Sequence, residues 1–71
     1  MNDINSVIKT VMKDNNFTQA DLARLFSVSP QAINGKFKRG SWDLSEVIKV
    51  LDAMDCKLII QSGSIKQYNF N

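Results

Sequence analysis

The chain has 71 residues, of which 44% are hydrophobic and 23% are charged, and its formal net charge is +2. This length predicts a single domain with one modest core, and the composition excludes a disordered or collagen-like chain. There is no histidine and only one cysteine, Cys56, which excludes Ser-His-Asp and Cys-His catalytic sites and a four-ligand zinc finger. We therefore expect a protein that is not an enzyme and that takes no metal, no other cofactor and no small-molecule ligand.

The sequence predicts neither a secretory leader nor a membrane span. Its first residues are polar, and the apolar run at residues 58–60 is far shorter than the ~20 residues that cross a bilayer. A lone cysteine forms no intramolecular disulfide, and we interpret Cys56 as a small buried hydrophobe, with a redox role as the alternative. These features predict a cytoplasmic protein without a membrane partner.

Residues 4–13 predict an amphipathic helix, because their apolar side chains recur at the spacing of one helical stripe. Asp3 is suited to cap its start, and Asn15 and Asn16 are suited to a left-handed stop. The stripe consists of Ile4, Val7, Ile8, Val11 and Met12.

Two further short helices are predicted, over residues 18–26 and residues 29–40, with a tight turn between them. Thr18 and Asp21 are spaced as a capping box. Ser29 followed by proline starts the second helix, and a glycine ends it. The side chains expected to face the core are Phe17, Leu22, Leu25, Phe26, Val28, Ile33 and Phe37.

A fourth helix is predicted from Asp43 to about Met54, with Asp43 and Glu46 as a second capping box. Its apolar stripe consists of Leu44, Val47, Ile48, Leu51 and Met54. The only tryptophan, Trp42, comes just before this helix. We expect it to pack over the preceding loop, with stacking on a base as the alternative.

Residues 57–70 predict a β-hairpin. Gly63 and Ser64 suit a two-residue type II′ turn, because glycine readily takes the positive φ that its first position requires. With this turn, Ile59 lies opposite Tyr68 on one face of the hairpin. The predicted fold class is therefore mostly α, with four compact helices and a C-terminal hairpin.

Positive charge is concentrated in the middle of the chain. Residues 22–42 contain four basic residues and no acidic residue, whereas the rest of the chain has a net charge of −2. A local excess of this kind is typical of a surface that meets an anionic partner. A solvated basic face is the alternative.

Two short helices joined by a turn, with amides and lysines on the second, form the layout of a helix-turn-helix. Residues 18–34 read TQADLARLFSVSPQAIN and resemble the Xre family of lambda-repressor- and Cro-like DNA-binding domains. The resemblance extends over residues 3–55, including a small residue, Ala23, where the two helices cross. It implies that residues 1–56 form a DNA-binding domain. We expect the hairpin of residues 57–71 to belong to the same folding unit.

The resemblance further implies which residues meet DNA. The second motif helix lies in the major groove, and Ser29, Gln31 and Asn34 fall where base edges are read. Glutamine and asparagine amides bond to adenine N6 and N7. Thr18 and Gln19 are expected to contact the DNA backbone at the N-terminus of the first motif helix.

The basic residues Lys36, Lys38 and Arg39 are expected to contact phosphates from the far end of the second motif helix. Simple solvation is the alternative for Gln31 and Asn34. For Arg24, on the first motif helix, solvation and phosphate binding are equally expected.

Three departures from the family pattern affect these details. Ser27 replaces the usual turn glycine, which predicts mild strain if it is left-handed. The end of the second motif helix has one extra residue after Ile33. Gly35 lies inside that helix at a cost of about 1 kcal/mol, so either the backbone approaches DNA closely there or the helix frays.

These features predict a sequence-specific, double-stranded-DNA-binding transcriptional regulator. Its small size, without an effector domain, resembles repressors of phages and mobile elements. The alternative is a protein-interaction module with the same fold, in an antitoxin-like or anti-repressor role. Steep salt dependence of binding would distinguish DNA from a protein partner.

The hairpin predicts a homodimer that reads a pseudo-palindromic operator. One reading helix contacts too few base pairs to select a site in a genome, and a two-fold dimer doubles the contacts. In the predicted register, Leu58 and Ile60 cover the helical core, while Ile59, Tyr68 and Phe70 form the dimer interface. A monomer whose hairpin folds onto its own helices is the alternative.

Overall fold

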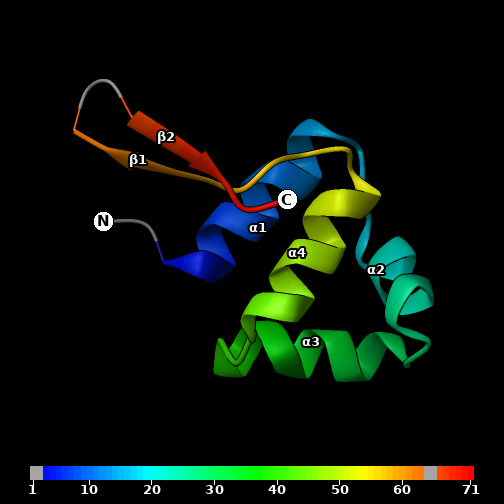
Figure 1. Cartoon of the computed structure of the whole chain (residues 1–71). Helices are drawn as coiled ribbons and strands as arrows, with labels where there is room; N and C mark the ends of the chain where they lie inside the picture. The colour runs from blue at the N-terminus through cyan, green and yellow to red at the C-terminus, as the bar shows by residue number, and fades with distance from the viewer. Residues whose placement is uncertain (1–2, 64–65) are drawn as a thin grey trace.

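Four short helices and a two-stranded antiparallel hairpin make up the fold in a computed structural model of the chain, which describes residues 3–63 and 66–71 (Figure 1). The elements are α1 (Ile4–Asp14), α2 (Gln19–Phe26), α3 (Pro30–Arg39), α4 (Leu44–Ala53), β1 (Ile59–Ser62) and β2 (Lys66–Asn69). The predicted mostly helical class with a C-terminal hairpin is confirmed. No helix in this described part of the chain combines the length and apolarity needed to cross a membrane.

Each helix starts at the cap that the sequence predicted. The side chains of Asp3, Thr18, Ser29 and Asp43 each accept a hydrogen bond from the backbone N–H three residues later, at 2.8–3.1 Å. The capping boxes of α2 and α4 are both complete. Because such bonds satisfy N–H groups that have no partner within the helix, local sequence sets these four starting points.

The ends of the helices are also determined by nearby residues. Asn16 and Ser27 have φ of 55°, and Gly40 has φ of 64°, so each takes the left-handed conformation that stops or redirects the chain. The left-handed residue predicted after the first helix is Asn16. This conformation is mildly strained for Ser27, as expected of a residue other than glycine.

The core lies between the four helices and is entirely hydrophobic. Its buried residues are Ile8, Met12, Leu22, Ala23, Ile33, Phe37, Val47, Val50 and Leu51. Trp42, Cys56 and Leu58 pack against it and are partly buried.

Three predictions about the core are wrong. In α1, Ile4 and Val7 of the predicted stripe are exposed, and the buried residues are Ile8 and Met12. Val28 is 43% exposed, because it lies in the turn between α2 and α3.

In α4, the buried stripe is Val47, Val50 and Leu51, whereas Leu44 is exposed. The buried side of α4 is centred on Val47, Val50 and Leu51, and Leu44, in the first turn, lies at the edge of this stripe.

The hairpin register differs from the prediction by one residue. Ile60 lies opposite Tyr68, and Ser62 lies opposite Lys66, which leaves three residues between the strands where two were expected. Gly63 has the predicted positive φ, 65°, whereas the other predicted turn residue, Ser64, lies outside the described residues. The predicted pairing of Ile59 with Tyr68 is wrong, because Ile59 lies opposite Asn69.

This shift regroups the apolar side chains, since neighbouring residues of a strand point to opposite faces. Ile60 and Tyr68 share a face, and Leu58 and Phe70 continue it, because the Phe70 N–H donates to the Leu58 carbonyl at 2.8 Å. Ile59 points to the other face. The predicted grouping of Ile59 with Tyr68 and Phe70 is therefore wrong.

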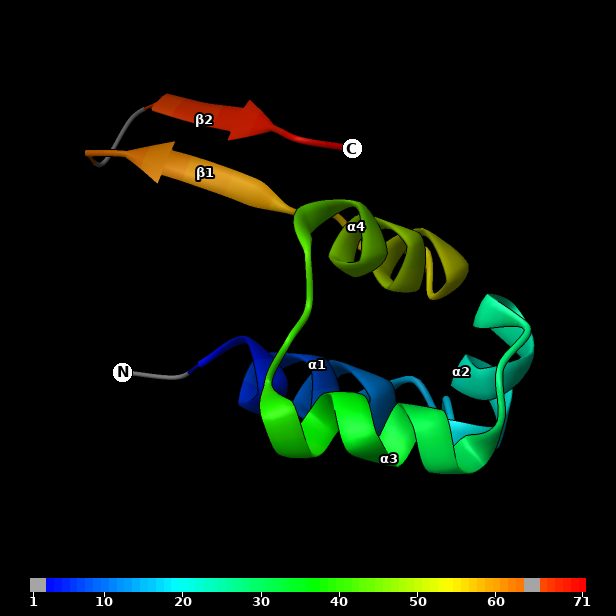
Figure 2. The same ribbon diagram turned by 90° about the horizontal axis from the view of Figure 1, so that it is seen from below.

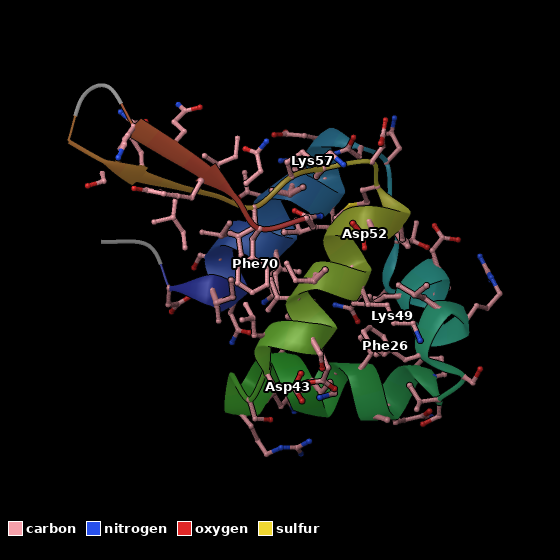
Figure 3. The ribbon with its side chains drawn as sticks, viewed as in Figure 1. Phe26, Asp43, Lys49, Asp52, Lys57 and Phe70 are labelled. Atoms are coloured by element: carbon pink, nitrogen blue, oxygen red, sulfur yellow. The ribbon has the colours of Figure 1, made fainter. Side chains whose placement is uncertain are left out.

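The base of the hairpin is attached to the helical body. Leu58 packs against the core, and the Asn71 carboxamide accepts from the Leu58 N–H at 2.7 Å. The same carboxamide donates to Asp52 of α4 at 2.6 Å and to the Cys56 carbonyl at 3.1 Å. Phe70 lies at this base, on the side of α4 away from Phe26 (Figure 3).

Beyond its base, the hairpin projects from the helices. Both strands extend past α4, away from α2 (Figure 2), and their residues are all exposed. Ile60, predicted to cover the helical core, is 55% exposed. The described chain measures 41 × 23 × 21 Å, and the projecting hairpin accounts for this elongation.

Candidate nucleic-acid interface

Helices α2 and α3 form a closely packed pair joined by a three-residue turn. Ala23 and Leu22 of α2 are buried, and so is Ile33 of α3. Ser27 turns the chain in the left-handed conformation, and the Val28 N–H donates to the Ala23 carbonyl at 3.0 Å. The small side chain of Ala23 permits the close approach of the helices that the motif requires.

The rotation of α3 is fixed by Ile33 and Phe37, whose side chains are buried. With 3.6 residues per turn, Gln31 and Lys38 lie on the side of the helix away from these two residues, and Asn34 lies at the edge of that side. All three residues are exposed. The structure therefore brings two of the predicted base-reading residues and one predicted phosphate contact onto a single outward face.

Ser29 also lies at the exposed N-terminus of α3, where its hydroxyl accepts a hydrogen bond from the Ala32 N–H at 3.1 Å. The oxygen thus caps the helix, and the hydroxyl proton remains available to donate a hydrogen bond.

The N-terminus of α2 carries Thr18 and Gln19, both exposed. An acidic side chain, Asp21, shares this first turn. The Thr18 N–H, which donates to the Asp21 carboxylate at 2.9 Å, holds the pKa of that carboxyl below its ordinary value, and the Arg24 guanidinium adds to the effect. The ion pair between Arg24 and Asp21 offsets the negative charge beside the predicted phosphate contacts.

Lys36 does not join the outward face of α3. Its Nζ lies 2.5 Å from a Glu46 carboxylate oxygen and 5.2 Å from the centre of the Trp42 ring. Its side chain is only 24% exposed. Lys36 therefore links α3 to the start of α4, a role that its charge and position in the sequence did not indicate.

Gly35 lies within an uninterrupted helix, so fraying, one of the two alternatives for this position, is not observed. The guanidinium of Arg39, one turn later, lies over it: a Cβ built on Gly35 would be 3.0 Å from Arg39 Nη1. Arg39 itself is exposed.

Sequence reasoning missed Asn5, which holds the far end of α3. The Asn5 carboxamide donates to the Phe37 carbonyl and accepts from the Trp42 indole N–H, both at 2.6 Å. Trp42 packs edge-on against Phe37, with the ring centres 5.2 Å apart, so its predicted packing role is confirmed. An asparagine in a first helical turn gives no sequence signal of such a role, because it looks like a solvated residue.

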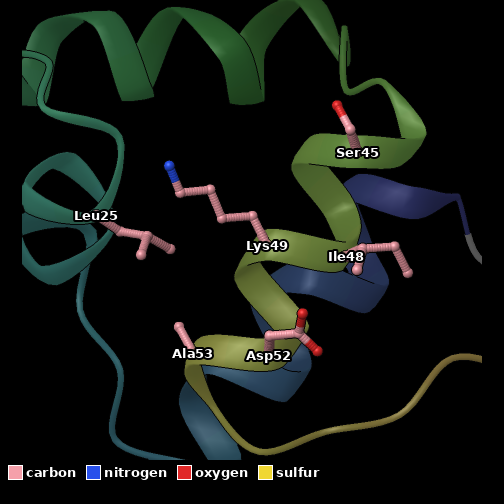
Figure 4. Close-up of a pocket in the computed structure, with 6 residues that line it drawn as sticks. All are labelled: Leu25, Ser45, Ile48, Lys49, Asp52 and Ala53. Atoms are coloured by element: carbon pink, nitrogen blue, oxygen red, sulfur yellow. The ribbon is translucent and has the colours of Figure 1, made fainter. Parts of the chain in front are cut away.

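A hollow of about 500 Å³ between α2 and α4 offers no cluster of reactive groups (Figure 4). Lys49 and Asp52 are the ionisable residues that line it. The Lys49 ammonium lies 5.3 Å from the centre of the Phe26 ring, and Asp52 accepts from Asn71. Among residues 3–63 and 66–71, no three histidine, cysteine or acidic side chains gather as metal ligands.

Comparisons with protein-family models, with curated proteins and with solved structures find no match to this chain. The helix-turn-helix motif and the geometry of α2 and α3 are thus the basis for a functional assignment.

Proposed function

We propose that this protein is a cytoplasmic transcriptional regulator that binds double-stranded DNA with sequence specificity through a lambda-repressor-like helix-turn-helix. The observation that carries this proposal is the outward face of α3. Burial of Ile33 and Phe37 leaves Gln31 and Asn34 exposed together on the helix that the motif assigns to the major groove. Side chains with paired donors and acceptors are suited to the distinct edge of each base pair there.

Phosphate contacts come from both helices of the motif. Lys38 and Arg39 lie at the C-terminal end of α3, and Thr18 and Gln19 lie at the N-terminus of α2, where the helix dipole favours an anion. Lys36 is left out of this set, because Glu46 already neutralises its charge.

A binding selection from random DNA duplexes tests the proposal and gives the operator. On the selected duplex, Gln31→Ala and Asn34→Ala are each expected to cost about 1–3 kcal/mol of binding free energy and to relax preference at one base pair. Retention of both affinity and selectivity by these two variants would overturn the assignment of the reading helix.

Two lysines of the same helix provide a matched control. Lys38→Ala should weaken binding to selected and random duplexes alike and reduce the slope of log affinity against log salt by about 1. Lys36→Ala should leave that slope unchanged, since this lysine pairs with Glu46.

We further propose that the protein binds DNA as a homodimer through its hairpin. One α3 helix contacts only a few base pairs, and a two-fold pair reads half-sites about 34 Å apart. The interface is the apolar face of Ile60, Tyr68 and Phe70, each 50–55% exposed, in place of the face around Ile59. An isolated two-stranded hairpin is marginally stable, so pairing with a second copy stabilises both.

Sedimentation at micromolar concentration tests the dimer. The double variant Ile60→Ser, Tyr68→Ser is expected to sediment as a monomer, whereas Ile59→Ser, on the opposite face, remains a dimer. A wild-type monomer that binds a single half-site would contradict the proposal.

The same exposed apolar face favours a second candidate, a protein-interaction module. In that case the hairpin binds a different protein and α3 has no DNA contact. Absence of any salt-dependent duplex binding, together with a monomeric wild type, is the result that supports this alternative.

A further inference from the structure

Two of the four basic residues of the helix-turn-helix, Lys38 and Arg39, have no ion pair within the described residues, and of these only Arg39 lies over Gly35. Arg24 pairs with Asp21, and Lys36 pairs with Glu46. Within the described part of the chain, Arg39 has no ion pair, although Glu46 lines the same cleft. The N–H donors of its guanidinium therefore have no carboxylate partner among the described residues.

Gly35 determines where this guanidinium lies. Long side chains in a helix lean toward its N-terminus, which brings the Arg39 head group back by one turn. At that level the helix carries no side chain, and Arg39 Nη1 occupies the space beside the Gly35 Cα, 3.0 Å from where a Cβ would stand. The glycine therefore provides a seat for the guanidinium on the surface of α3.

The seat lies beside a predicted base-reading residue. Gln31, Gly35 and Arg39 line one cleft of about 340 Å³ along α3. By sequence position Arg39 belongs to the phosphate-contacting end of the helix, but its head group is displaced toward the end that reads bases. A planar guanidinium matches the O6 and N7 acceptors of guanine in bidentate fashion.

We infer that Arg39 reads a guanine in the operator and that Gly35 is its positioning residue. This inference rests on the proposed function and changes the role of Arg39 from phosphate contact to base contact. It also gives a reason for a glycine in the middle of α3, where an alanine is more favourable to the helix.

The experiment repeats the duplex selection with the full chain carrying Arg39→Ala and Arg39→Lys. Arg39→Ala is expected to lose preference for guanine at one position, by about 5- to 150-fold. Arg39→Lys is expected to lose only part of that preference, because an ammonium reaches O6 and N7 without the planar fork of the guanidinium. Lys38→Ala is the matched control and should weaken binding to all sequences alike. Circular dichroism should remain that of the wild type, since Arg39 is exposed.

A double-substitution cycle tests Gly35. Gly35→Ala displaces the far end of a flexible side chain, so the helix should form at least as well as in the wild type, with reduced preference for the same guanine. On the Arg39→Ala background, Gly35→Ala should change neither preference nor affinity.

Three results would overturn the inference. A uniform loss of affinity in Arg39→Ala, with the salt slope reduced as in Lys38→Ala, makes Arg39 a phosphate contact. Equal weakening by Gly35→Ala on both backgrounds means that Gly35 admits the DNA backbone itself. Failure of the wild type to bind any duplex overturns the proposed function as well, and only this last result does so.

Discussion

The helical body buries apolar side chains in a core, whereas the two strands of the hairpin leave theirs exposed. The four helices enclose nine buried hydrophobic residues, and their ends are fixed by caps from adjacent residues. The hairpin keeps every strand residue exposed and is joined to the body at its base, through Leu58 and Asn71. This difference indicates that the body supplies most of the stability of the fold and that the hairpin contributes little to it.

The largest expected effect contrasts the two regions directly. Leu22→Ala removes a fully buried side chain from the body and should lower the free energy of unfolding by about 2–5 kcal/mol. Ile60→Ala removes a half-exposed side chain from the hairpin and should change it by less than about 0.5 kcal/mol.

Urea unfolding followed by circular dichroism, at a concentration where the protein is monomeric, measures both. A loss for Ile60→Ala comparable to that for Leu22→Ala would mean that the hairpin belongs to the folding core.

A smaller effect is expected at the caps of the body. Thr18→Ala removes the hydroxyl that accepts the Asp21 N–H and should lower the free energy of unfolding by about 1 kcal/mol. Thr18→Ser keeps the hydroxyl and is the control. Equal thermal stability of the two variants would show that the capping bond contributes nothing to the fold.

The smallest expected effect is a loss of stability at acid pH, which we expect for the helical body and not for the hairpin. The backbone N–H groups that donate to Asp3, Asp21 and Asp43 lower the pKa of each carboxyl. The caps therefore stabilise the fold above the ordinary aspartate pKa, and this stabilisation is lost as the pH falls below about 4 and through the lowered values.

Thermal unfolding between pH 7 and pH 2 measures this dependence. The unfolding midpoint should fall in the acid range, and Asp43→Asn should flatten that fall, because the asparagine cap does not titrate. Residues 57–71 contain no acidic side chain, so a truncation of the hairpin should leave the shape of the pH profile unchanged. A flat profile for the wild type is inconsistent with ionised caps.

Predictions from the sequence were correct where neighbouring residues act on one another. The capping residue lies three positions before the N–H that it satisfies, so Thr18 and Asp43 could be recognised without knowing the fold. Predictions failed where a distant segment decides. The contacts of Lys36 with Glu46 and Trp42, which come from the helix and loop that follow, were not predicted.

Within the candidate site, too, some features could be predicted from the sequence and others could not. The spacing of Ile33 and Phe37 predicted which face of α3 is buried, and therefore the exposure of Gln31 and Asn34. The seat of Arg39 over Gly35 and the anchoring of α3 by Asn5 were not predicted, because both depend on where side chains end in space.

The sequence by itself determined the four helices, their capped starts and the inward face of α3, since hydrogen bonds and apolar periodicity within one helix are written in nearby residues. Only the tertiary structure decided the hairpin register, the exposed face of Ile60 and Tyr68, and the partner of Lys36. A shift of one residue inverts the faces of a strand, and nothing within four exposed residues selects between the two registers. That choice depends on the attachment of Leu58 and Asn71 to the helical body.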